Sequence, residues 1–244
     1  MKGVAYLALA CLALLGCQKV EKAEEQPAKA KIASQAAEVK KVSWDEAIKS
    51  IGPEKDKKIK DDGTYTYIQY IARPDSKDKV ALFVTRDEFK KVRFYHTYFG
   101  YSNIISRGAS LNMYISLRDG YKPRVVLSPI FKGSEWLFMN KLQIMADGNL
   151  IVDREIPYDD VERRQVDSGV KEEAHVFLTG PEVSSLRQAT ISKNISVRLS
   201  GQEGYLNIKK RDIEFLSDGV RDTLIGYDLI WSALPMAKEV DSDI

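Results

Sequence analysis

The amino-acid sequence predicts an α+β fold, in which an antiparallel β-sheet or sandwich carries a short N-terminal helix and a C-terminal amphipathic helix. Three observations lead to this prediction. Short segments rich in β-branched and aromatic residues fill the first half of the chain, and Asp-Gly pairs lie between some of them. After Asp212 the apolar residues recur every three or four positions, which is the period of a helix.

The first expected element is a short helix that begins after Ser43. Ser43 is a good N-cap residue and Glu46 stands three positions later, so the two can form a capping box. The pattern predicts a helix over residues 44–51, ended by Gly52-Pro53.

Strands are expected next, because most of the following apolar segments are bounded by Gly, Pro, Asp or Ser. They cover residues 64–71, 80–85, 92–99, 111–117 and 124–127. A hairpin is expected where Asp147-Gly148 separates the apolar residues of 136–145 from those of 150–152. Asp and Gly tolerate the positive φ that a tight primed turn requires.

The second half mixes strands and helices. Thr179 can cap a helix that has Pro181 in its first turn. Strands are predicted over residues 161–166, 174–178, 195–199 and 205–208. One face of a final helix is formed by Ile213, Leu216, Val220, Leu224, Tyr227, Trp231 and Leu234, and Gly219 and Gly226 are expected to kink or break it.

The first seventeen residues have the pattern of a targeting signal. Lys2 gives a positive start, and residues 4–15 form an apolar run that is too short to span a bilayer. The run closes with Leu14-Leu15-Gly16-Cys17, which resembles the lipobox of bacterial lipoproteins. The resemblance implies cleavage after Gly16, a diacylglyceryl thioether on Cys17 and an acylated amino terminus, with palmitate as a typical acyl group. The alternative is a plain secretory peptide with a chance cysteine.

Four segments follow from these patterns: a signal peptide over residues 1–16, the lipidated cysteine with a flexible tether over 17–43, one globular domain over 44–238, and a disordered tail over 239–244. The tether is mostly Lys, Glu, Ala and Gln with no aromatic residue, so it cannot bury enough apolar surface to fold. Gln18 replaces the aspartate that commonly retains such lipoproteins at the inner membrane. The resemblance therefore implies an outer-membrane lipoprotein of the cell envelope, with its domain facing the periplasm.

Charge gives no sign of a nucleic-acid partner. The chain has 37 basic and 35 acidic residues, and without Lys2 and the tether's six lysines and four glutamates, residues 44–244 keep 30 basic against 31 acidic. A near-neutral domain argues against nucleic-acid binding.

Few residues suggest catalysis or a metal. His96 and His175 each lie inside an expected strand, where a structural histidine is commoner than a ligand, so neither a metal nor a cofactor is expected. Ser76 and Lys79 match a Ser-x-x-Lys spacing by chance, because no companion motif is present. The Asp159-Asp160 pair with Glu162 favours an ion-pair network with the adjacent Arg154, Arg163 and Arg164 over a calcium site.

Aromatic residues crowd two early strands and the turn after them. They are Tyr65, Tyr67, Tyr70, Phe94, Tyr95, Tyr98, Phe99 and Tyr101. Their alternation puts aromatic side chains on both faces of a sheet, so one set can fill the core. The other set can form an exposed binding surface, for which Tyr67 and Tyr98 are the candidates, although core packing is the commoner use.

The second half of the chain is similar to β-rich bacterial envelope lipoproteins that have no assigned activity. The similarity rests on residues 132–138, Asp147-Gly148 and residues 196–201. Together these observations favour a lipid-anchored envelope protein with a non-catalytic binding or scaffolding domain, whose partner is an envelope protein or polysaccharide. The alternative function is a hydrolase acting on cell-wall or lipid material, using Ser76 or a carboxylate.

Overall fold

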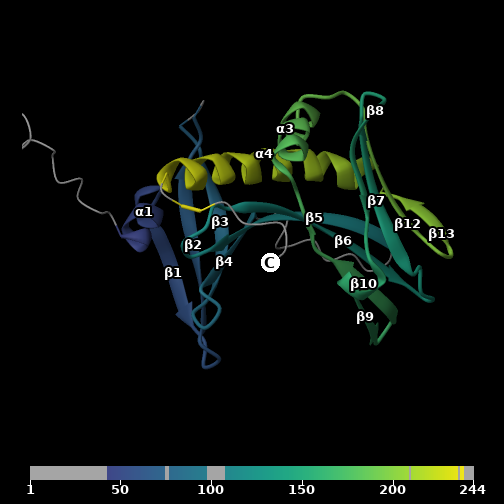
Figure 1. Ribbon diagram of the computed structural model, residues 1–244, viewed down its shortest axis with the longest axis horizontal. Coiled ribbons are helices and arrows are strands. Elements are labelled where there is room, and N and C mark those ends of the chain that lie inside the picture. Colours follow the sequence, from purple (N-terminus) through teal and green to yellow (C-terminus); the bar gives the residue numbers. More distant parts are fainter. Residues whose placement is uncertain (1–42, 75–76, 98–107, 209, 236, 239–244) are drawn as a thin grey trace, which may run out of the picture. The chain divides into compact units, whose positions relative to one another are not determined.

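A computed structural model describes residues 43–74, 77–97, 108–208, 210–235 and 237–238, without the side chains of residues 210–217. All of these residues belong to one compact unit. It consists mainly of antiparallel β-structure with a few helices (Figure 1). The predicted α+β fold class, with its short first helix and its C-terminal helix, is therefore confirmed.

The larger of the two described sheets is antiparallel throughout. Its order is β1-β2-β3-β4-β5-β6-β10-β9, and β11 pairs with β6 beside β10. The strands are β1 (Glu54–Ile59), β2 (Thr64–Ala72), β3 (Lys79–Asp87), β4 (Val92–Thr97), β5 (Gly108–Arg118), β6 (Arg124–Gly133), β9 (Val161–Val166), β10 (Gly169–Ala174) and β11 (Val176–Phe177).

The smaller sheet has the order β13-β12-β7-β8. Its strands are β7 (Met139–Ala146), β8 (Asn149–Glu155), β12 (Ile195–Gly201) and β13 (Gly204–Asn207). The β7–β8 hairpin turns at Asp147 and Gly148, which have φ values of 46° and 84° as a primed turn requires. The expected Asp-Gly hairpin is therefore confirmed.

Three α-helices are described: α1 (Trp44–Ser50), α3 (Gly180–Ala189) and α4 (Lys210–Ala233); Tyr158–Asp160 form a 3₁₀ turn, η2. Both short helices begin with a capping box. In α1 the Glu46 amide N–H donates to Ser43 Oγ and the Ser43 N–H donates to Glu46. In α3 the Thr179 N–H donates to Glu182 Oε2 at 2.8 Å.

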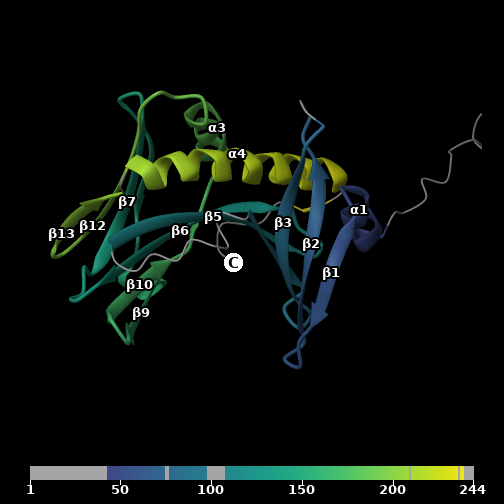
Figure 2. The same ribbon diagram turned by 180° about the vertical axis from the view of Figure 1, so that it is seen from behind.

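Helix α4 covers one face of both sheets, and Figures 1 and 2 show it running along them. Val220 and Leu224 pack into the core cluster that includes the smaller sheet, whereas Ile230 and Leu234 pack into the cluster over β2 to β5. Gly226 faces the sheet, and a Cβ atom at this position would stand 3.0 Å from Leu82 Cδ1. The glycine therefore lets the helix approach the sheet and does not break it, contrary to the prediction.

A buried carboxylate connects the two sheets. Glu172 of β10 is fully buried, and it accepts hydrogen bonds from the amide nitrogens of Leu137, Phe138 and Met139 at 2.6, 2.9 and 2.7 Å. Phe138 has φ 52°, so three successive N–H groups converge on one anion. The start of β7 is thereby fixed against the larger sheet.

Several strand boundaries differ from the prediction. β1 is an edge strand rich in lysine, so no apolar pattern marks it in the sequence. Lysines on an edge strand discourage pairing with other chains. The strand expected over 174–178 is divided into β10 and β11. Residues 136–138 form the loop that binds Glu172, so β7 begins only at Met139.

Candidate ligand-binding cleft

The tyrosine proposed as a binding surface turns out to be a core residue. Tyr67 is 3% exposed and packs in the same cluster as Tyr95, which is fully buried. Burial raises the pKa of Tyr67 to about 12, despite the opposing charge of Arg93. The candidate role of Tyr67 on an exposed surface is therefore wrong, because its strand turns this face toward the core. Tyr98, Cys17 and Ser76 lie outside the described residues.

The two histidines come together around Tyr114. The ring centroids of His96 and Tyr114 are 4.9 Å apart, and the Tyr114 hydroxyl lies 3.2 Å from His175 Nδ1. Burial, with a smaller contribution from the charge of His175, lowers the pKa of His96 to about 4. The described residues hold no cluster of three potential metal ligands. A neutral, half-buried His96 acts as a packing residue here.

The expected ion-pair network around Asp159-Asp160 does not form among the described residues. Arg154 pairs with Glu182 at 2.8 Å, and Arg163 Nε lies 3.7 Å from Glu172. Arg163 also lies over the Tyr158 ring. The acids and arginines are adjacent in sequence, but the two arginines extend to partners on α3 and β10.

Two buried arginines lie opposite each other on β3 and β4, on the sheet face that α4 covers. Arg86 and Arg93 are each 3% exposed, and both donate to Asp119 at 2.6 to 2.7 Å. Arg93 also pairs with Asp45 of α1. Burial opposes the charge of Asp119, but the hydrogen bonds and charges of the two arginines outweigh burial and lower its pKa.

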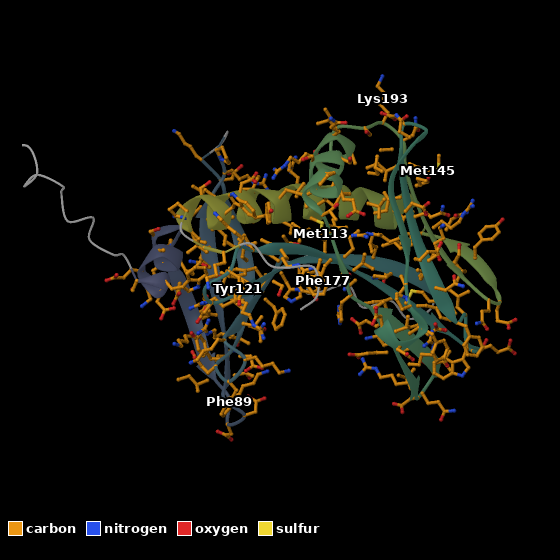
Figure 3. The ribbon with its side chains drawn as sticks, in the orientation of Figure 1. Phe89, Met113, Tyr121, Met145, Phe177 and Lys193 are labelled. Carbon is orange, nitrogen blue, oxygen red and sulfur yellow. The ribbon has the colours of Figure 1, made fainter. Side chains whose placement is uncertain are left out.

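The opposite face of the larger sheet, here called the distal face, carries a cleft. It has a volume of about 180 Å³. Its lining residues come from β4, β5, β6, the β5–β6 turn and β11: Val92, Ser116, Arg118, Tyr121, Lys122, Arg124 and Phe177. Figure 3 labels Tyr121 and Phe177, which approach the cleft from the turn and from β11.

Strand pairing determines which side chains meet in this cleft. Arg118 lies opposite Val92, and Ser116 lies opposite Arg124, so these four residues share the distal face. Next in sequence after Arg118, Asp119 points the other way, toward Arg86 and Arg93. The nearest carboxylate in sequence is therefore committed to the core face, and no acidic residue is among those that line the cleft.

Each cation of the cleft has a different environment. The Arg124 guanidinium lies 3.9 Å from the centroid of the Phe177 ring, and burial lowers the pKa of Arg124. Lys122 is 9% exposed and donates to the Trp231 carbonyl of α4 at 3.2 Å. The side chain of Arg118 is exposed and makes no hydrogen bond or ion pair with another described residue.

This arrangement can bind an anion. Arginine presents N–H groups in a planar fork that matches a carboxylate or phosphate. Ser116 and Tyr121 add hydroxyl groups at the same site, and Phe177 and Tyr121 add apolar area beside the charge. The cleft is smaller than the roughly 300–1,000 Å³ typical of drug-sized ligands. It therefore suits one charged group or one sugar unit.

The sequence contained a signal for part of this cleft that was not used. Three cations stand within seven residues around a hairpin turn, at Arg118, Lys122 and Arg124. Phe177 is more than fifty residues away in sequence and reaches the cleft only because β11 pairs with β6.

No protein-family model matches the chain, and no curated protein or solved structure matches it significantly. Among the described residues, no helix is long and apolar enough to cross a membrane. Fold and site together define an α+β domain that carries a basic cleft on an antiparallel sheet. The chemistry of that cleft is therefore the basis for a functional proposal.

Proposed function

We propose that this chain is a lipid-anchored lipoprotein of the bacterial cell envelope whose domain binds an anionic group of an envelope polysaccharide and does not catalyse. The observation that carries the binding role is the lining of the distal-face cleft: the two arginines Arg118 and Arg124, two hydroxyl groups and no carboxylate, while the Lys122 ammonium bonds to α4. Such a lining favours a phosphate or carboxylate as the group bound.

The leader sequence supports the anchoring. A basic start, a short apolar run and Leu14-Leu15-Gly16-Cys17 occur in the order that lipoprotein processing needs. Gln18 supports the outer membrane as the destination, with the domain in the periplasm. Envelope polysaccharides are rich in acidic sugars. A tethered domain in the periplasm could therefore reach many anionic groups that fit such a site.

Titration calorimetry with three related sugars tests the binding role. Glucose 6-phosphate and glucuronate carry a phosphate and a carboxylate, and glucose carries neither. We expect the two anions to bind in the millimolar range or tighter, more weakly as salt rises, and glucose not to bind detectably. Equal binding of glucose would contradict the proposal.

A matched pair of variants locates the site. Arg118→Gln should weaken glucose 6-phosphate binding about tenfold, as expected for one charge-assisted hydrogen bond worth about 1.5 kcal/mol. Arg164→Gln changes an exposed arginine of β9, at the far edge of the same sheet, and should leave binding unchanged. If both variants lose affinity equally, binding depends only on the net charge of the protein and not on this cleft.

A further inference from the structure

The chain leaves α4 and returns to the rim of the cleft. The Lys238 carbonyl accepts a hydrogen bond from the Lys122 amide at 2.7 Å, and the Lys238 N–H donates to the Gly120 carbonyl at 3.0 Å. Lys238 thereby forms a parallel β-bridge with Tyr121. Because Tyr121 and Lys122 both line the cleft, whatever follows Lys238 in sequence starts at its edge.

Three of the six residues that follow Lys238 are acidic, and none is basic. The six read Glu-Val-Asp-Ser-Asp-Ile, with carboxylates at 239, 241 and 243. This spacing of two residues is the period at which an extended chain presents side chains to one side. Six extended residues reach about 20 Å, which is more than the width of a cleft of this size.

We propose that residues 239–244 are an internal ligand of the distal-face cleft and compete with the external anion for Arg118 and Arg124. The inference rests on the proposed function and adds its regulation: the free domain is self-blocked, and a ligand must displace the acidic segment. Charge complementarity supports this occupant, since three carboxylates follow a chain position fixed at a rim lined by cations.

Tethering makes a weak interaction sufficient. A segment joined directly to the rim of its site has an effective concentration in the millimolar range. An intrinsic dissociation constant of about a millimolar would therefore leave the cleft occupied roughly half of the time or more. Exposed ion pairs are individually weak, so the segment can still be displaced by a ligand with better geometry.

The first test compares two triple variants of the full chain that change net charge equally. Glu239→Gln with Asp241→Asn and Asp243→Asn neutralises the segment, and Asp159→Asn with Asp160→Asn and Glu162→Gln neutralises three exposed acids around η2 and β9. We expect the first variant to bind glucose 6-phosphate three- to tenfold more tightly than the natural sequence, and the second to bind it with unchanged affinity. Equal affinities for the two variants would overturn the inference.

The second test needs no sugar. A fluorescently labelled peptide of residues 238–244 is titrated onto the neutralised-segment variant, with and without Arg118→Gln. Binding that weakens at least fivefold with Arg118→Gln supports the inference, and undetectable binding or an unchanged affinity overturns it. If the peptide binds and no sugar anion does, the proposed function fails while the inference about the segment stands.

Discussion

The carboxylate of Glu172 lies 2.7 Å from the amide nitrogen of Met139, at the point where the chain enters the smaller sheet. It accepts two further N–H groups from the preceding residues. The three N–H donors compensate the charge of this fully buried carboxylate. Without the carboxylate these donors, two of them buried, would lose their acceptor.

Replacing this carboxylate with an amide should therefore destabilise the fold. In Glu172→Gln the amide group offers one acceptor oxygen and directs N–H donors at other donors, so we expect a loss of about 2 to 4 kcal/mol in the free energy of unfolding. Urea unfolding followed by circular dichroism measures it. Glu162→Gln, on the exposed edge strand β9, is the control and should change the free energy by less than about 0.5 kcal/mol.

Asp119 should matter for stability at neutral pH. Asp119→Asn leaves the two buried arginines, Arg86 and Arg93, without their shared counter-charge, and we expect a loss on the order of 3 kcal/mol. Thermal and chemical unfolding at pH 7 measure the loss. Glu88 Oε1 also lies 3.4 Å from Arg86 Nε, and Asp45 pairs with Arg93, so a loss below about 1 kcal/mol would mean that these two acids compensate both arginines.

The same carboxylate predicts a pH dependence. The pKa of Asp119 is lowered from 3.8 in the folded protein, so its contribution to stability is complete above that pH and is lost as the pH falls through the folded value. The stability difference between the natural sequence and Asp119→Asn should therefore be constant from pH 7 to pH 5 and shrink below about pH 4. Unfolding curves across this range check it, and a difference that grows at low pH would contradict the assigned charge.

Tyr67 gives a direct test of core packing. Tyr67→Ala should cost about 3 to 5 kcal/mol, as for other truncations of buried aromatic residues, and lower the melting temperature accordingly. Tyr67→Phe keeps the ring and should cost far less. Scanning calorimetry separates the two variants. An unchanged melting temperature for Tyr67→Ala would contradict the assignment of Tyr67 to the core.

Anchoring can be tested independently of the fold. We expect the natural sequence to partition with membranes even in high salt, because two or more acyl chains bind far more strongly than one. Cys17→Ser should remain uncleaved or lose its acyl chains. Mass spectrometry of the mature amino terminus decides, since any terminus other than acylated Cys17 excludes lipoprotein processing.

Local signals in the sequence predicted those elements that local chemistry specifies. The capping residues Ser43 and Thr179 and the Asp147-Gly148 turn act within a few residues of themselves, and each was identified correctly. β1 was not, because a lysine-rich edge strand is held by pairing with β2 and has no apolar pattern of its own. The role of Gly226 was not predicted for a similar reason. Its missing side chain leaves room for Leu82 of β3, which is distant in sequence.

The candidate site was harder to predict than the fold. Which face of a strand meets the core depends on where the covering helix lies, so the alternation around Tyr67 could not say which aromatic set is exposed. The cleft needs the β5–β6 turn, β4 and β11 to meet, and this is decided by strand pairing over more than fifty residues. Only its three basic residues near the turn were visible in sequence.

The position of α4 along the chain has a consequence for biosynthesis. Both core clusters need side chains of this helix, yet it follows every described strand in sequence. Until residues 210–233 have emerged, both core clusters lack the side chains of this helix, so the growing chain cannot complete its core. If the chain is exported as proposed, this order delays completion of the core until the last helix has been made, which would help the chain to stay unfolded while it crosses the membrane.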